Sequence, residues 1–88
     1  MDKEKHYIID HFFRHEYGRT VSILTKRFGT QNFDHIEDAV QEAMVKAMQV
    51  WPYKGVPQNP SSWIFKTAQN KLLDQLRRVM MTEKKNRA

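Results

Sequence analysis

Glycine and proline divide this chain into three segments in which apolar residues recur with the period of a helix. The segments span residues 5–28, 34–51 and 59–81, and no stretch alternates convincingly between polar and apolar residues. Gly29 tolerates the left-handed conformation that ends many helices, and Pro52 lacks the N–H that would continue one. The pattern therefore predicts an all-α protein, folded as a small bundle of three to four helices.

Local sequence features mark where these helices begin and break. Gly18 is a poor helix former in the middle of the first segment, and it allows a kink or break there. Asp34 and Glu37 have the spacing of a capping box at the start of the second helix. Asn59 is the expected N-cap of the third helix, and Pro60 follows it at the first helical position, where a missing N–H costs nothing.

The third helix is expected to end at Met80 or Met81, because residues 82–88 show no apolar periodicity. Residues 1–81 are therefore predicted to form one helical domain, and residues 82–88 a frayed basic tail or the start of a linker. Prolines and a glycine predict a loop at residues 52–59, between the second and third helices.

The inward-facing side chains follow from the helical period. In the first segment they are Ile8, Phe12, Val21, Leu24 and Phe28. In the second they are Ile36, Val40, Ala43, Met44, Ala47 and Trp51. In the third they are Phe65, Ala68, Leu72, Leu76 and Val79, flanked by Ile64 and Met80.

The size and composition of the chain exclude several classes of protein. Its 88 residues suffice for one core and leave little interior for a buried catalytic chamber. The absence of cysteine excludes disulfides, thiolate nucleophiles and Cys-based zinc sites. No apolar run approaches the roughly 20 residues that span a bilayer. We therefore expect a soluble protein of the cytoplasm with no membrane partner.

The net charge of +5 is confined to the last third of the chain. Residues 1–60 contain eight Lys/Arg and eight Asp/Glu, whereas residues 61–88 contain seven Lys/Arg and two Asp/Glu. A charge asymmetry of this kind is typical of a protein with a polyanionic partner, although a basic tail is by itself weak evidence.

A polar stripe lies on the second helix, opposite its apolar side. Its members recur at helical spacing: Asp38, Gln41, Glu42, Val45 and Gln49. From spacing alone, a solvated face remains the simpler interpretation. The apolar Val45 within the stripe, and the lack of basic partners for Asp38 and Glu42 along it, instead favour a docking surface for a basic partner helix.

The third helix has a mixed outer face: Trp63, Lys66, Thr67, Asn70, Lys71, Asp74, Arg77 and Arg78. Basic side chains suit phosphates, an aromatic ring suits base stacking and an amide suits base edges, so the face is typical of nucleic-acid binding. An ordinary solvent-exposed helix face would explain the charged residues equally well, but it would not explain Trp63. The sequence leaves open whether Trp63 belongs to this surface or folds back onto the core.

Residue patterns for catalysis or metal binding are weak. His11 and His15 have the spacing of two metal ligands on one helix, but no third ligand accompanies them at helical spacing. The chain has no Gly-rich phosphate loop, and no serine or threonine has a His/Asp pair placed by the sequence. No catalytic residue, cofactor, metal or small-molecule substrate is therefore predicted.

Two motifs resemble those of bacterial sigma factors. Residues 36–43, IEDAVQEA, resemble the EDxxQE helix of sigma region 2. Residues 59–78 resemble the later helix of that region, with its pattern W-[aliphatic]-x-x-x-A-x-N-x-x-x-D-x-x-R-R. The short Pro-rich stretch between them resembles one branch of the extracytoplasmic-function sigma factors. The resemblance covers roughly residues 10–80 and implies the all-α fold of region 2.

The resemblance also implies roles for the two polar surfaces in transcription initiation, without catalysis by this chain. The stripe that docks on the β′ clamp helices of RNA polymerase corresponds to Asp38, Gln41, Glu42, Val45 and Gln49. The residues that recognise and melt the promoter −10 element correspond to Tyr53, Lys54, Asn59, Trp63, Lys66, Thr67, Asn70, Lys71, Arg77 and Arg78. An anti-sigma factor is a further partner that the resemblance allows.

The chain departs from the family pattern in two ways. Sigma factors of this group carry a C-terminal helix-turn-helix domain for the −35 element, which these 88 residues do not contain. The third helix has few aromatic residues beyond Trp63 and Phe65, so melting is expected to depend more on base capture by the loop than on stacking. Two other functions stay open: a generic basic nucleic-acid-binding protein, and a helical protein-interaction module without a DNA function.

Overall fold

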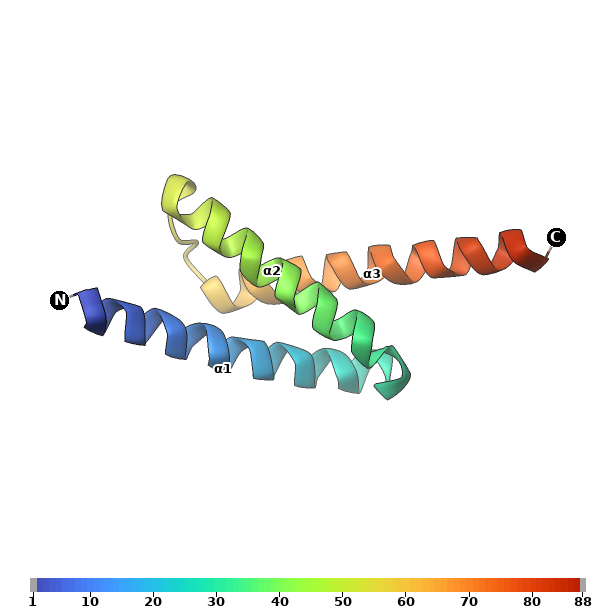
Figure 1. Ribbon diagram of the computed structural model, residues 1–88, viewed down its shortest axis with the longest axis horizontal. Coiled ribbons are helices and arrows are strands. Elements are labelled where there is room, and N and C mark those ends of the chain that lie inside the picture. The colour runs from blue at the N-terminus through green and yellow to red at the C-terminus, as the bar shows by residue number, and fades with distance from the viewer. Residues whose placement is uncertain (1, 88) are drawn as a thin grey trace.

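Three helices and one short 3-10 turn make up the fold. The computed structural model describes the backbone of residues 2–87 and the side chains of residues 9–82. The elements in chain order are α1 (Asp2–Phe28), η1 (Thr30–Asn32), α2 (Phe33–Lys54) and α3 (Pro60–Arg87) (Figure 1). The described backbone contains no strand, so the predicted all-α class is confirmed.

Helix α1 runs without interruption through Gly18, so the break that this glycine allows does not occur. A glycine costs a helix only about 1 kcal/mol relative to alanine, which packing of the flanking turns against α2 and α3 can offset. The predicted stop at Gly29 is confirmed: its φ is 94°, and its N–H donates to the carbonyl of Thr25 at 2.8 Å. The side chain of Ile8, a predicted core residue, lies outside the described residues.

The predicted capping box at the start of α2 is wrong. The helix begins at Phe33, and Asn32 occupies its N-cap without a side-chain hydrogen bond to the helix. The Asn32 amide instead donates to the carbonyl of Phe28 at 2.8 Å, and Glu37 accepts a hydrogen bond from the Tyr17 hydroxyl at 3.2 Å. Asp34 therefore lies inside the first helical turn, and Glu37 joins α2 to α1.

Helix α2 continues through Pro52 to Lys54, one turn past its predicted end at Trp51. Pro52 lacks the N–H that would bond to the carbonyl of Met48. Met48 is on the exposed side of the helix, where water can hydrate that carbonyl. Gly55 then ends the helix with a φ of 89°, and its N–H donates to the carbonyl of Trp51 at 2.8 Å.

The predicted start of α3 is confirmed, but its predicted end is not. The Asn59 side-chain oxygen accepts the N–H of Ser62 at 3.1 Å, which is the geometry of an N-cap. The helix continues to Arg87, past Met80 and Met81, and its last turns extend beyond α1 and α2 (Figure 1). Residues 82–87 contain no glycine or proline, so they can continue a helix without an apolar face.

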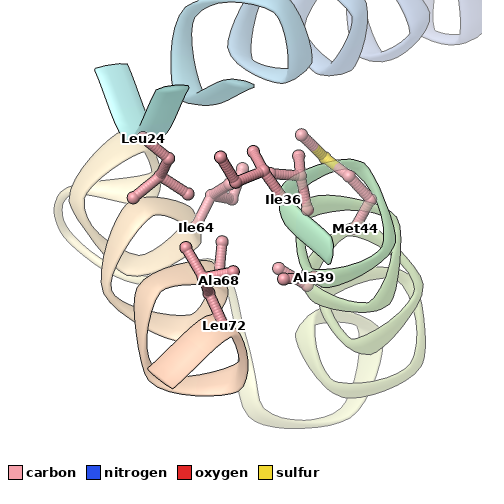
Figure 2. Packing of buried hydrophobic residues seen from close by; sticks show 9 residues of the cluster. Leu24, Ile36, Ala39, Met44, Ile64, Ala68 and Leu72 are labelled. Carbon is pink, nitrogen blue, oxygen red and sulfur yellow. The ribbon is translucent and has the colours of Figure 1, made fainter. Parts of the chain in front are cut away.

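The core lies mainly between α2 and α3, and Leu24 of α1 closes it. Figure 2 shows Ile64, Ala68 and Leu72 of α3 pointing toward Ile36 and Ala39 of α2. The remaining buried apolar side chains come from α2: Val40, Ala43, Met44 and Ala47. Most predicted core positions of α2 are confirmed, and Ala39 is an addition to them.

The inward face of α3 is rotated relative to the prediction. Ile64, predicted on the flank, is fully buried, whereas Phe65, predicted in the inner stripe, is half-buried beside Arg27 of α1. Leu76 is half-buried, and Val79 and Met80 are 38% and 61% exposed because they lie where α3 leaves the bundle. Between residues 2 and 87, no helix is both long and apolar enough to traverse a bilayer.

Candidate functional site

The polar stripe on α2 is exposed along its whole length. Asp38, Gln41, Glu42, Val45 and Gln49 all lie on the surface, and Val45 is 50% exposed. Together with Lys46, Val50 and Lys71 they line an open groove of about 550 Å³ beside α3. The five residues thus share one face, which offers carboxylates and amides around an apolar centre.

An ion pair joins this stripe to α3. The Lys71 ammonium lies 3.5 Å from a carboxylate oxygen of Glu42. The lack of a basic partner for Glu42 was predicted along the stripe alone, and the partner comes from the neighbouring helix α3. Asp38 makes no ion pair among the described side chains. The stripe therefore keeps one unpaired carboxylate.

The outer face of α3 carries the predicted cations, but two of them are paired. Lys66, Asn70, Arg77 and Arg78 are exposed, and Thr67 and Lys71 are half-buried. Arg77 lies 3.9 Å from Asp74 on the same helix, and Lys71 pairs with Glu42. Lys66 and Arg78 make no ion pair among the described side chains.

Trp63 packs onto α2 and remains half-buried. Its ring meets the Trp51 ring edge-on, with centroids 5.3 Å apart, and Trp51 stacks on Phe13 at 5.8 Å. This answers the question left open by the sequence, since part of the indole is covered by the core while part remains on the surface. Phe13, Trp51 and Trp63 thus form one aromatic cluster at the start of α3.

The predicted loop is shorter than expected. Tyr53 and Lys54 belong to the last turn of α2, where Tyr53 is 90% exposed, and residues 55–59 make the connection to α3. Asn59 is exposed, and its side-chain oxygen is engaged as the cap of α3. The predicted DNA-binding residues thus lie at the end of α2, in the connection and on α3.

The family model described as Sigma-70 region 2 matches residues 12–80. This chain belongs to the sigma-70 region 2 family. Sigma-70 proteins are transcription-initiation factors and not enzymes.

An uncharacterized protein of Rhizobium meliloti (strain 1021) is 38% identical over 48 residues, which is 54% of this chain and 11% of that protein. The chain thus spans about a tenth of the length of that relative. No solved structure gives a significant match.

The sigma-70 region 2 domain has a polar seam between α1 and α3 that the sequence analysis missed. Glu16 is only 4% exposed and accepts a hydrogen bond from the Ser61 hydroxyl at 2.8 Å. Arg27 donates to the side-chain oxygen of Gln69 at 3.0 Å, and its guanidinium lies 5.2 Å from the centroid of the Phe65 ring. The four-residue spacing of Ser61, Phe65 and Gln69 places all three on one face of α3, which was the available clue.

The histidines considered as metal ligands form no three-ligand group with the other side chains of residues 9–82. His11 and His15 are both exposed on α1. Within the described part of the chain, no group of three or more His, Cys, Asp or Glu side chains could hold a metal ion.

Proposed function

We propose that this domain is region 2 of an extracytoplasmic-function sigma factor, which docks on RNA polymerase and recognises and melts the promoter −10 element. The observation that carries the proposal is the placement of the two family motifs. One presents an exposed acidic stripe on α2, and the other an exposed basic and aromatic face on the adjoining helix α3. Two partners can therefore be bound at once, in the cytoplasm, without catalysis by this chain.

The proposed polymerase surface is the stripe on α2, and its partner is the β′ clamp helices of the core enzyme. Val45 supplies an apolar contact at the centre of the stripe, and Gln41 and Gln49 supply hydrogen-bonding groups. Asp38 and Glu42 attract a basic partner and set its orientation, which is the usual contribution of charged groups at an interface.

The proposed DNA surface begins at the connection between α2 and α3 and continues along α3. Basic side chains hold phosphates, and amide groups read base edges. Tyr53 and Trp63 offer ring faces on which unpaired bases can stack. The full set is Tyr53, Lys54, Asn59, Trp63, Lys66, Thr67, Asn70, Lys71, Arg77 and Arg78. Residues 82–88 then provide a basic extension or the start of an interdomain linker.

Melting requires that the protein bind the single-stranded state better than the duplex. Extruding a base costs a few kcal/mol, and stacking on an aromatic side chain returns about 1–3 kcal/mol per base. Trp63 suits this role because contact with Trp51 fixes its ring before DNA arrives. A ring already held in place loses little conformational entropy on binding.

Pull-down with the cognate β′ clamp helices tests the polymerase surface. We expect the triple variant Asp38→Ala, Gln41→Ala, Glu42→Ala to lose most of the binding of the wild type. The matched control is Asp34→Ala, which removes an exposed carboxylate from the first turn of the same helix and should bind normally. Undiminished binding by the triple variant would contradict this interface.

One observation favours a second function, a protein-interaction module that binds polymerase or an anti-sigma factor and no DNA. Two of the four cations on the outer face of α3, Lys71 and Arg77, are ion-paired. The salt dependence of single-stranded DNA binding separates the two functions. If about four phosphates are neutralised, log affinity falls with log salt at a slope near −3, whereas a slope near zero favours the protein-interaction module.

A further inference from the structure

The positive charge available on α3 is smaller than its sequence indicates. Lys71 is paired with Glu42 at 3.5 Å and Arg77 with Asp74 at 3.9 Å. Among the described side chains, only Lys66 and Arg78 of the proposed α3 cations lack an ion pair. A strand held along α3 therefore needs further cations, and α1 carries arginines on the side that faces α3.

Arg27 of α1 is held directly against α3. Its guanidinium lies over the Phe65 ring, 5.2 Å from the centroid, and donates to Gln69 at 3.0 Å. Phe65 and Gln69 are one helical turn apart, and Lys66 lies between them in the sequence. Arg27 is exposed and makes no ion pair among the described side chains, and one hydrogen bond uses only one of its five donors.

A second arginine lies on the same side of α1. Arg19 and Arg27 both line a hollow of about 420 Å³ at the start of α3, together with Asn59, Ser62 and Phe65. Glu16 also lines the hollow, but its carboxylate is buried and accepts a hydrogen bond from the Ser61 hydroxyl. The two arginines are eight residues apart, about 12 Å along the helix, so they can meet different phosphates.

We infer that Arg27 binds a backbone phosphate of the single strand held by α3, with Arg19 as a second cation, so that the nucleic-acid surface continues across the seam onto α1. The inference rests on the proposed function. A guanidinium suits this contact because its planar fork binds phosphate through two hydrogen bonds. Phe65 and Gln69 hold Arg27 in place before DNA arrives, which reduces the entropy lost on binding.

The test measures binding of a fluorescent single-stranded DNA to the full chain at several salt concentrations. Loss of one phosphate contact makes the slope of log affinity against log salt less negative by about 0.7, which corresponds to about five-fold weaker binding at 0.1 M salt. We expect both changes for Arg27→Gln. Lys26→Gln is the matched control, since it removes the same charge from the preceding exposed residue, and it should leave the slope unchanged.

Two further variants separate the alternatives. Gln69→Ala removes the anchor of Arg27 but keeps its charge, so it should weaken binding and leave the slope unchanged. Lys66→Gln reports on α3 itself. If Lys66→Gln makes the slope less negative and Arg27→Gln does not, or if Arg27→Gln and Lys26→Gln act alike, the inference about α1 is wrong. If the wild type binds DNA with no salt dependence, the proposed DNA function itself fails.

Discussion

Helix α3 packs on its two neighbours in different ways. Against α2 it buries apolar side chains, with Ile64, Ala68 and Leu72 at the centre. Against α1 it makes polar contacts, in which Glu16 meets Ser61 and Arg27 meets Gln69. The apolar α2–α3 interface supplies stability and carries both family motifs. The polar α1–α3 seam fixes the position of α3 and brings additional charge to its outer face.

The largest effect is expected at the α2–α3 interface. Ile64→Ala removes a fully buried side chain and leaves a cavity, so it should lower the free energy of unfolding by about 2–5 kcal/mol. Urea denaturation followed by circular dichroism measures this. Val79→Ala, on the exposed part of α3, should change stability by less than about 0.5 kcal/mol. Equal effects of the two variants would show that Ile64 is not part of the core.

A smaller effect is expected at the polar seam. Glu16→Ala leaves the Ser61 hydroxyl without its partner at 2.8 Å, which should lower the free energy of unfolding by about 1–3 kcal/mol. Glu16→Gln retains a side-chain oxygen that can accept from Ser61, so it should restore part of the loss. If neither variant moves the urea midpoint, the seam does not contribute to stability.

The next largest effect is expected at the N-cap of α3, because both interfaces depend on where this helix starts. Asn59→Ala removes the acceptor for the N–H of Ser62 and should cost about 1 kcal/mol, measured by thermal unfolding. Asn59→Asp keeps an acceptor at the same place and adds a charge that is favourable at a helix N-terminus, so it should unfold like the wild type. If the Asn59→Ala variant were as stable as the wild type, the Asn59 cap would not contribute to the stability of the fold.

The smallest effect is expected at the exposed edge between α2 and α3. Glu42→Gln breaks the ion pair with Lys71, which lies in a partly exposed position, so it should change stability by less than about 1 kcal/mol. The difference from the wild type should shrink as salt is added, because exposed charges are screened. A loss as large as that of Ile64→Ala would show that the two helices depend on this ion pair.

The predictable parts of the fold are those encoded by neighbouring residues. The apolar faces of α2 and α3 follow from helical spacing, and the start of α3 follows from Asn59 and Pro60. The start of α2 could not be derived in this way, because Glu37 bonds to Tyr17, twenty residues away in the chain. Helical spacing also put Phe65 in the inner stripe of α3 and Ile64 on its flank, because spacing within one helix does not say how two neighbouring helices divide that face.

The exposure of the candidate site residues could be predicted from the sequence, whereas their ion pairs and hydrogen bonds with other helices could not. The stripe from Asp38 to Gln49 is as exposed as its spacing predicts. The partnership of Glu42 with Lys71 joins two helices, and that of Glu16 with Ser61 spans forty-five residues of sequence. Helical periodicity describes each helix by itself, so such contacts, and with them the role of Arg27, emerge only once the helices are assembled.

The central claim is that this domain reads a promoter element as single-stranded DNA while bound to polymerase. Selection of bound strands from a random pool tests this claim most directly. The domain, together with cognate core polymerase, is incubated with a pool of single-stranded DNA of random sequence, and the bound strands are sequenced. We expect one short motif to be enriched among the bound strands. For the Asn70→Ala variant, the preference for a particular base should be lost at one position of that motif. Recovery of strands with the composition of the input pool, by a domain that still binds polymerase, would contradict it.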